Sequence, residues 1–499
     1  MNILLVSREF PPETAFGGIA TFVQLLARGL TAAGHSVVVL SQTFGAEREE
    51  QDELEPRVRV LRLAVPRLGP LDPARLSLHL FAELFAQRVA RAAADLYRSF
   101  PFDLIETPDH LAEGLHCLPF AQARGIPVVT RLYSPWSLLA EMGLHLPGAG
   151  DAATRAALRS MEERLLRQSD ALTAPSRDLA RRVAAHFHLH ADITFIPNPV
   201  DTARFHPPPP DPAAPSSPAG APLALLFVGR LEDRKGCQDL PAVWEALRPW
   251  HAHIGLTVLG PDTPNTGRSD QTGRSMLAQL LTDFTRRGFG PALRNRHAAN
   301  GTTAAPPGAA GPAAPDPDRR PAAGCLELTP RVPLADLARV YRAHDLLLAP
   351  SRYDNSPYTV IEAMASGLAV VATDAGGSAE YLGPVPDAPR ALSTLSTPPT
   401  PPNPRSTPIG PGGFRPAVGG RLVRPGDIAG MVAAIRSLLA LDRVPDPAAS
   451  TPPLDPALPA FLALRRAGRE RILALCDPAE VVRRTLELYD RARARKQIF

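Results

Sequence analysis

Asp354 and Glu362 are the residues of this chain whose types and spacing point most directly to chemistry. They stand in the segment 351–367, on either side of a predicted helix start, with apolar strands predicted before and after the segment. Helical side chains lean toward the helix N-terminus, so the carboxylate of Glu362 should point back to that start. An ionised carboxylate only accepts hydrogen bonds, which suits a diol such as a ribose.

The start of this helix should itself attract an anion. Ser356 can cap the helix and Pro357 fits its first position, which leaves the N–H groups of Tyr358 and Thr359 facing outward at the positive end of the helix dipole. Taken alone, the segment is better explained as an ordinary buried helix with a surface glutamate. The prediction of a ligand site therefore depends on the motifs that surround it.

A second segment supplies cations. Arg230 and Lys235 follow the predicted strand 223–229, so they should emerge at the carboxyl edge of a sheet, where α/β folds bind ligands. An arginine fork and a lysine point charge together could neutralise a departing diphosphate, although taken singly the segment is better explained as a charged turn. Glycine turns at 17–18 and 376–377 would let the backbone approach a ligand closely, and neither is the G-x-G-x-x-G of dinucleotide-binding folds.

The elements that must position these residues alternate between strands and helices. Strands are predicted at 2–7, 37–40, 58–63, 102–106, 127–132, 170–174 and 193–196, with helices near 19–33, 75–98, 151–168 and 176–187. Further strands are predicted at 223–229, 254–260, 325–329, 345–350 and 368–373, again with helices between them. This order predicts an α/β protein with two Rossmann-like, doubly wound domains.

Proline-rich segments divide the chain. With 499 residues it is too long for one hydrophobic core, and its 57 prolines gather in a few runs. We predict an N-terminal domain over 1–205, a linker over 206–222 and a C-terminal domain over 223–477 with insertions near 296–323 and 384–417. The basic amphipathic helix at 478–499 should pack back on the N-terminal domain.

Composition narrows the classes of function. The net charge is +4, from 54 basic and 50 acidic residues, so nothing in the overall charge requires nucleic acid or an anionic membrane as a partner. The four cysteines include no C-x-x-C pair, which argues against a zinc site and favours a reducing cytoplasm. No stretch approaches ~20 apolar residues and no signal peptide is recognised. We expect a cytoplasmic protein, with peripheral contact at the inner face of the membrane as the open alternative.

In this order the motifs resemble the GT-B glycosyltransferases, specifically the large retaining GT4-like family (glycosyl transferases group 1). The matching positions are Gly17-Gly18, 170–176, 196–201, Gly229-Arg230 with Lys235-Gly236, 351–367, 376–380 and 420–427. The segment 351–380 is the specific part of this resemblance, which covers nearly the whole chain outside the insertions.

The resemblance implies a nucleotide-diphosphate sugar donor held by the C-terminal domain, an acceptor held by the N-terminal domain, and transfer with retention, without a metal or cofactor. Arg230 and Lys235 would bind the donor diphosphate, Glu362 the ribose and Asp354 the transferred sugar. Arg230, Lys235 and Asp354 are therefore the expected catalytic residues. The other expected donor contacts are Gly17, Gly18, Gly229, Asn355, Ser356, Pro357, Tyr358 and Thr359.

Two positions depart from the family pattern. Asp354 stands where the family usually has a glutamate, and its side chain is one methylene shorter, which predicts an altered donor preference. Tyr133 stands where members commonly carry a histidine, and a phenol cannot act as an imidazole does near neutral pH. Glu106, His110 and Arg131 join Tyr133 as expected acceptor contacts.

Two alternatives stay open at this point. A sugar-nucleotide epimerase could use the same two-domain architecture, but we locate no acid and base residues for it. A nucleotide-sugar-binding pseudoenzyme or scaffold is suggested by Tyr133 and Asp354, and binding without turnover would distinguish it. For a transferase, the expected acceptor is a glycan, a lipid carrier or a small metabolite.

Overall fold

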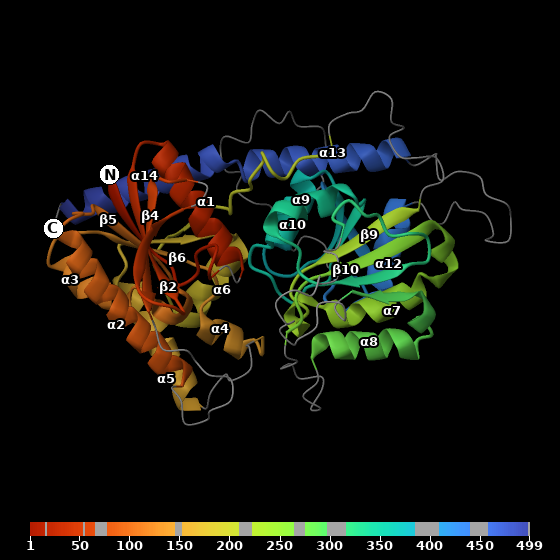
Figure 1. The fold of residues 1–499 in the computed structure, drawn as a ribbon, viewed down its shortest axis with the longest axis horizontal. Coiled ribbons are helices and arrows are strands. Elements are labelled where there is room, and N and C mark those ends of the chain that lie inside the picture. The colour runs from red at the N-terminus through yellow and green to blue at the C-terminus, as the bar shows by residue number, and fades with distance from the viewer. Residues whose placement is uncertain are drawn as a thin grey trace, which may run out of the picture. The chain divides into compact units, whose positions relative to one another are not determined.

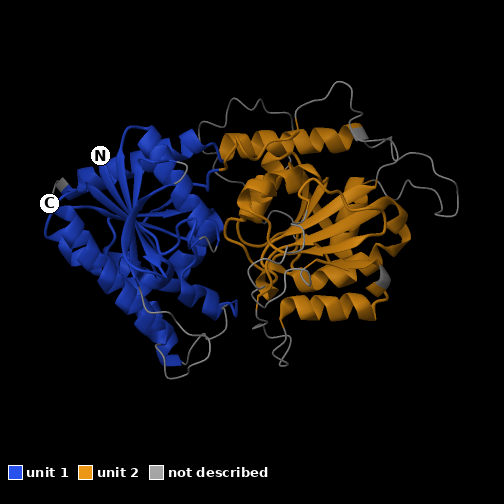
Figure 2. Cartoon of the chain, viewed as in Figure 1, with its two compact units in different colours: residues 1–199, 476–499 blue, residues 200–475 orange. Residues whose placement is uncertain are grey.

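The computed structural model describes residues 1–14, 17–52, 55–64, 77–144, 152–208, 222–263, 275–296, 316–384, 409–439 and 458–497. The chain forms two compact units, residues 1–199 with 476–499 and residues 200–475 (Figure 2). Within the described ranges, each unit is built on its own eight-stranded, largely parallel sheet with helices on both faces. The predicted fold class, with two Rossmann-like α/β domains, is confirmed.

The sheet of unit 1 has the strand order β3-β4-β2-β1-β5-β6-β7-β8, and β3 alone runs antiparallel to its neighbour among these strands. The strands are β1 (Asn2–Val6), β2 (Ser36–Thr43), β3 (Arg48–Gln51), β4 (Val58–Ala64), β5 (Leu104–Pro108), β6 (Val128–Arg131), β7 (Ala171–Ala174) and β8 (Ile193–Phe195). The strand order reverses at β1, between β2 and β5. In such sheets, ligands bind outside the carboxyl ends of the strands at the point of reversal.

Helices cover both faces of this sheet (Figure 1). They are α1 (Gly18–Ala32), α2 (Leu78–Tyr97), α3 (Leu118–Gln122), α4 (Trp136–Glu141), α5 (Ala152–Gln168), α6 (Arg177–Phe187) and α14 (Pro478–Gln497), with short 3-10 turns at His110–Ala112 and Leu115–Cys117. α2 packs with α5 on one face and α1 packs with α14 on the other. A Cβ at Gly29 of α1 would lie 2.3 Å from Cγ2 of Val482, so a glycine lets α1 and α14 approach closely.

The sheet of unit 2 has the order β11-β12-β10-β9-β13-β14-β16-β15, with β15 antiparallel to β16. The strands are β9 (Leu223–Val228), β10 (Ile254–Leu259), β11 (Leu293–Asn295), β12 (Leu326–Thr329), β13 (Leu346–Ala349), β14 (Ala369–Thr373), β15 (Phe414–Ala417) and β16 (Gly420–Val423). The central strands are continuous apolar runs, which suits a sheet covered on both faces. The strand order reverses at β9, between β10 and β13.

The helices of unit 2 form two layers (Figure 1). They are α7 (Leu240–Ala246), α8 (Met276–Arg286), α9 (Leu334–Arg342), α10 (Tyr358–Ala365), α11 (Ser378–Leu382), α12 (Ile428–Leu439) and α13 (Leu458–Leu475), with 3-10 turns at Asp233–Lys235, Cys237–Asp239, Arg248–His253 and Gly290–Ala292. α7, α8 and α12 cover one face and bury Trp244, Phe284 and Ile435 against it. None of the helices described in either unit is long and apolar enough to cross a membrane.

The units divide at residue 199, six positions before the predicted end of the N-terminal domain. Residues 200–207 belong to unit 2, where the Phe205 ring packs edge-on against Tyr341 of α9 at a centroid distance of 5.8 Å. Most of the predicted linker 206–222 lies outside the described residues. Helix α14 lies in unit 1, against α1 and β6.

The structure describes the ends of both predicted insertions, and these ends contact the rest of unit 2. Their central parts, residues 297–315 and 385–408, lie outside the described residues. Arg319 and Arg320, inside the predicted insertion 296–323, form ion pairs with Glu327 and Asp345. The strand β15, inside the predicted insertion 384–417, pairs with β16. The sequence did not predict that these ends belong to the domain, because their composition is proline-rich and only two or three charged or aromatic residues anchor them.

Candidate functional site

Two loops flank the point where the strand order of unit 2 reverses. The loop after β9 carries Arg230 and Lys235, and the loop after β13 carries Asp354. The loops touch directly, because the N–H of Arg352 donates to the carbonyl oxygen of Arg234 over 2.8 Å. The structure therefore brings the cationic turn and the start of the segment 351–367 together at one edge of the sheet.

Glycines allow this close contact. Gly236 has a φ of 72°, and a Cβ there would lie 1.9 Å from the carbonyl oxygen of Pro350. Gly376 has a φ of 63°, and a Cβ there would lie 2.0 Å from the carbonyl oxygen of Asp354, which also accepts the N–H of Gly377 over 2.8 Å. Both positions exclude a side chain by space and by backbone conformation.

Lys235 and Asp354 form an ion pair at the centre of this contact. The Nζ–Oδ2 distance is 2.5 Å, and the two side chains are 16% and 6% exposed. Burial opposes the ionisation of Asp354, but the positive charges of Lys235 and Arg234 outweigh it and lower the pKa of this carboxyl. Asp354 is therefore a carboxylate held between two cations.

Arg234 is a member of this cluster that the sequence did not single out. Its guanidinium donates to the carbonyl oxygen of Tyr353 over 3.3 Å and pairs with Glu232 at 2.8 Å. Arg230, which the sequence did single out, pairs with the same Glu232 at 3.3 Å and is 36% exposed. Both arginines stand in one charged run after β9, and the sequence carries no signal that distinguishes Arg234, which is 20% exposed, from Arg230.

The start of α10 differs from the prediction. Pro357 is the N-cap residue and Tyr358 the first helical residue, and the Ser356 side chain does not cap the helix. The Oγ of Ser356 lies 2.6 Å from the hydroxyl of Tyr381 on α11, so it is used in a tertiary hydrogen bond. The predicted cap is therefore wrong. Asn355 and Thr359 flank this start and are half-buried.

Glu362 lies in the second turn of α10 and is 5% exposed. Its Oε2 accepts a hydrogen bond of 3.0 Å from the hydroxyl of Tyr341 on α9. Burial raises the pKa of Glu362 to about 8, against the opposing effects of the Tyr341 hydrogen bond and the Arg204 charge. In the ligand-free protein this carboxyl is poised to change its protonation near neutral pH.

Helix α13 fixes the other end of α10. Arg469 donates to the carbonyl oxygen of Ala365 over 3.1 Å, and Arg465 donates to that of Gly367. These carbonyls belong to the C-terminal end of α10, where helical acceptors have no partner of their own. The two arginines satisfy them and hold the helix that carries Glu362.

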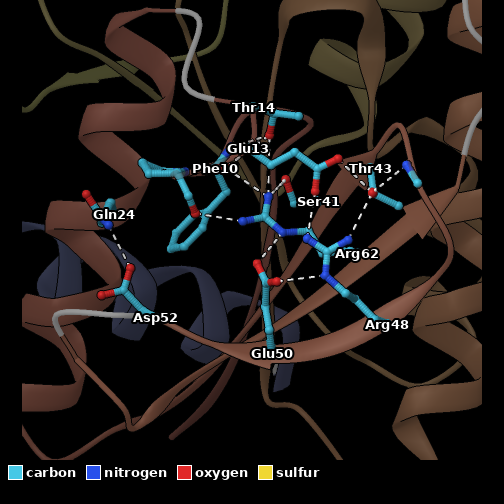
Figure 3. A network of polar contacts seen from close by, with 12 residues as sticks. Phe10, Glu13, Thr14, Gln24, Ser41, Thr43, Arg48, Glu50, Asp52 and Arg62 are labelled. Carbon is cyan, nitrogen blue, oxygen red and sulfur yellow. Dashed lines mark hydrogen bonds and ion pairs between the residues drawn. The ribbon is translucent and has the colours of Figure 1, made fainter. Parts of the chain in front are cut away.

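In unit 1, the loop after β1 leads to the expected donor contacts Gly17 and Gly18. Gly17 is the N-cap residue of α1, and a Cβ on it would meet nothing within 4 Å in the structure. The preceding loop, residues 7–14, is held by the wholly buried Arg62 of β4 (Figure 3). Its guanidinium donates to the carbonyl oxygens of Phe10 over 2.8 Å and Pro11 over 2.6 Å.

His110 and Tyr133 lie just beyond the carboxyl ends of the neighbouring strands β5 and β6. The N–H of Tyr133 donates to Oδ1 of Asp109 over 2.7 Å, and Nδ1 of His110 lies 3.1 Å from the carbonyl oxygen of Ser134. Both predicted acceptor contacts are half-buried at the sheet edge where ligands bind.

Glu106 and Arg131 lie inside their strands instead, 5% and 1% exposed. The hydroxyl of Tyr489 on α14 donates to Oε2 of Glu106 over 2.7 Å. Arg131 donates to Oδ1 of Asn198 over 2.9 Å and lies 3.7 Å above the ring of Phe22. Both side chains serve the interior of unit 1, so we do not retain the prediction that they contact an acceptor. Among the residues described, no group of three or more His, Cys, Asp and Glu side chains is arranged to hold a metal ion.

Comparison with known proteins agrees with this geometry. Residues 16–204 match the model of Glycosyltransferase Family 4, and residues 308–392 match that of Glycosyl transferases group 1. The glycogen synthase of Mycobacterium tuberculosis (strain ATCC 25618 / H37Rv) is 32% identical over 285 residues, which cover 54% of this chain. The match spans 64% of that relative, just under two thirds of its length.

Solved structures share the fold across both units. Sucrose-phosphate synthase from Thermosynechococcus elongatus has a TM-score of 0.65 at 20% identity, over 99% of both chains. The catalytic domain of starch synthase IV from Arabidopsis thaliana, bound to ADP and acarbose, has a TM-score of 0.60 at 13% identity, over 99% of both chains. At these identities the likeness shows the fold alone, which is the two-domain, Rossmann-like GT-B fold.

Proposed function

Since the chain belongs to the GT4-like glycosyltransferases of group 1, we propose that it transfers a sugar from a nucleotide-diphosphate sugar to an acceptor hydroxyl, with retention at the anomeric carbon. The observation that carries this proposal is the ion pair of Lys235 and Asp354, close to Arg234 and in a loop that also carries Arg230, at the point where the strand order of unit 2 reverses. A diphosphate needs several cations, and the transferred sugar needs a hydrogen-bond acceptor beside them.

The diphosphate of the donor would bind to the cations of this cluster. An ammonium group has three donors, so Lys235 can keep Asp354 while it donates to a phosphate oxygen. Arg230, which is 36% exposed, can offer its planar fork to the diphosphate. Asp354 would accept a hydroxyl of the transferred sugar, and Glu362 would accept the hydroxyls of the ribose.

The reaction needs positive charge where the leaving group departs. The bond between the anomeric carbon and the phosphate oxygen breaks, and its electron pair stays on the departing diphosphate. The acceptor oxygen bonds to the anomeric carbon on the same face of the sugar, and its proton passes to the departing phosphate oxygen. Lys235 and Arg230 would stabilise the developing charge. These two side chains would do so without a metal ion.

The relatives support a nucleotide donor and leave the acceptor class open. Starch synthase IV is bound to ADP, and the names glycogen synthase and sucrose-phosphate synthase stand for different products. We therefore keep a glycan, a lipid carrier and a small metabolite as acceptor classes. Asp354, shorter than the glutamate usual in the family, favours a donor preference of its own.

A pseudoenzyme that binds nucleotide sugars is the second candidate, because Tyr133 lies at the sheet edge of unit 1 where the family commonly has histidine. A thermal-shift screen of UDP-, ADP- and GDP-glucose, followed by a turnover assay with the stabilising donor, distinguishes the transferase from the pseudoenzyme. We expect release of the nucleoside diphosphate in the presence of acceptor and a product with the anomeric configuration of the donor by NMR. Stabilisation without any turnover over a broad acceptor panel would favour the pseudoenzyme.

Variants test the proposed diphosphate contacts. Arg230→Ala and Lys235→Ala should each weaken nucleoside diphosphate binding by ~1.5–3 kcal/mol, the scale of hydrogen bonds to charged groups. Lys235→Ala also leaves the buried Asp354 without its nearest cation, so the double variant Lys235→Ala/Asp354→Asn separates lost binding from lost stability. Arg286→Ala on α8 is the matched control, since this arginine is 73% exposed. Unchanged affinity by titration calorimetry in Arg230→Ala, Lys235→Ala and the double variant would refute the diphosphate role.

A further inference from the structure

Tyr341 is a fully buried tyrosine that belongs to none of the motifs behind the family resemblance. It lies on α9, and its ring packs edge-on against Phe205 at a centroid distance of 5.8 Å. Its hydroxyl donates to Oε2 of Glu362 over 3.0 Å. Both residues are in unit 2, so this contact does not depend on how the two units are placed.

The hydrogen bond from Tyr341 makes the two carboxylate oxygens of Glu362 different from each other. Oε2 is taken by Tyr341, and the part of the chain that the structure describes offers no hydrogen-bond donor to Oε1. Tyr341 cannot move away easily, because a buried phenol with no other acceptor would lose its hydrogen bond at a cost of about 1–3 kcal/mol. Oε1 is therefore the oxygen that a ligand would meet.

Two neighbouring groups favour the charged form of Glu362, which accepts hydrogen bonds, although burial still raises its pKa to about 8. The groups that act on Glu362 from the packed elements are the Tyr341 hydroxyl and the Arg204 guanidinium, and both lower its pKa against the larger effect of burial. Burial and the nearby carboxylate raise the pKa of Tyr341 well above its ordinary value, so its hydroxyl stays a donor. Loss of this donor would leave Glu362 more readily protonated and less able to accept.

We propose that Tyr341 is a positioning residue that holds Oε2 of Glu362, so that Oε1 accepts the ribose 2′-hydroxyl of the donor and the site prefers ribonucleotides to 2′-deoxyribonucleotides. This inference rests on the proposed function, since it assigns the ribose to Glu362. Beyond that function, the inference adds a role for Tyr341 of α9 and a preference for ribonucleotides that follows from this role. Tyr341 itself touches no substrate.

The test compares a ribonucleotide with its deoxy counterpart. Titration calorimetry first identifies which of UDP, ADP and GDP binds the wild-type protein most tightly, and the same protein is then titrated with the matching 2′-deoxynucleoside diphosphate. We expect a preference for the ribonucleotide of about tenfold, the scale of one hydrogen bond to a charged group. In Tyr341→Phe this preference should fall to about threefold or less, while the affinity for the deoxynucleotide changes less than about twofold.

Two further variants make the result specific. Glu362→Gln keeps the size of the side chain and should lose the preference as Tyr341→Phe does. Tyr489→Phe removes a buried tyrosine–glutamate hydrogen bond of 2.7 Å in unit 1 and should keep the full preference. A merely structural role of Tyr341 would weaken both nucleotides equally, and this outcome would overturn the inference, as would an unchanged preference in Glu362→Gln. Absence of binding of all three nucleotides to the wild type would overturn the proposed function itself.

Discussion

Two buried carboxyl groups should make the stability of unit 1 depend on pH. Glu113, in the loop after β5, accepts the N–H of Arg8 over 2.7 Å, and burial raises its pKa to about 7. Glu162 of α5 accepts the N–H of Trp136 at the start of α4 over 2.6 Å, and burial raises its pKa to about 7 as well. Both groups hold their proton more tightly in the folded protein than in the unfolded chain.

This difference makes unit 1 less stable as the pH rises. Between about pH 4.5 and 7 the unfolded Glu113 has lost its proton and the folded one has kept it, so unfolding releases a proton and its free energy falls. Glu113→Gln should therefore show a smaller decrease in melting temperature between pH 5 and 7.5 than the wild type, by calorimetry. The difference in free energy should reach about 3 kcal/mol at most, at ~1.4 kcal/mol for each pH unit.

Glu162 acts with the same sign, so Glu113→Gln should keep part of the slope. The double variant with Glu162→Gln should flatten it further. A full wild-type slope in Glu113→Gln would show that this carboxyl is ionised throughout the range.

The loop of residues 7–14 is an element that depends on one neighbouring side chain. Arg62 of β4 reaches the carbonyl oxygens of Phe10 and Pro11 and pairs with Glu50 of β3 at 2.5 Å, so a strand pair at the sheet edge fastens the loop before α1 (Figure 3). The side chain of Arg62 is wholly buried. The loop that precedes Gly17 and Gly18 is therefore held from β4.

Arg62→Met should lower the free energy of unfolding by about 3 kcal/mol, because it leaves buried carbonyl groups and a carboxylate without their partner. Turnover should fall, because this loop leads to the expected donor contacts Gly17 and Gly18, whereas nucleoside diphosphate affinity, which we assign mainly to unit 2, should weaken less than in Lys235→Ala. Arg59→Met on the same strand is the control: this arginine is 38% exposed and pairs with an exposed Glu49, so its loss should cost less than ~1 kcal/mol. Equal destabilisation by both variants would contradict the proposed role of Arg62.

The elements were predictable from periodicity, but side-chain burial near strand ends was not. The predicted strand 102–106 ends at Glu106, which would place this carboxylate at the ligand edge, whereas β5 continues to Pro108 and draws Glu106 into the interior. A shift of two residues is within the uncertainty of strand ends in sequence analysis. The position of Lys235 at the carboxyl edge of its sheet followed from the strand order, but its ion pair with Asp354 was not predicted. The roles of Arg234 beside Asp354 and of Tyr341 beside Glu362 were not predictable either, because they depend on tertiary packing between helices and loops far apart in the sequence.

At the scale of the whole chain, unit 1 is built from both ends of the sequence. Residues 476–499 return to it after the whole of unit 2. Helix α14 supplies the Tyr489 hydroxyl to the buried Glu106, and the Nζ of Lys496 binds Oδ1 of Asp170 over 2.7 Å. The other oxygen of Asp170 accepts the N–H of Val128 at the start of β6, so α14 supports the central strands directly.

A chain truncated after residue 475 should therefore lose unit 1 and keep unit 2. Without α14 the carboxylate of Glu106 has no hydroxyl partner, and the face of α1 at Gly29, shaped for Val482, is uncovered. Limited proteolysis should then degrade residues 1–199 while unit 2 resists and still binds the nucleoside diphosphate. Tyr489→Phe, which keeps the helix and removes one hydrogen bond, should cost only about 1–3 kcal/mol and leave both units resistant. Protection of residues 1–199 in the truncated chain equal to that in the full chain would show that unit 1 does not need the returning helix.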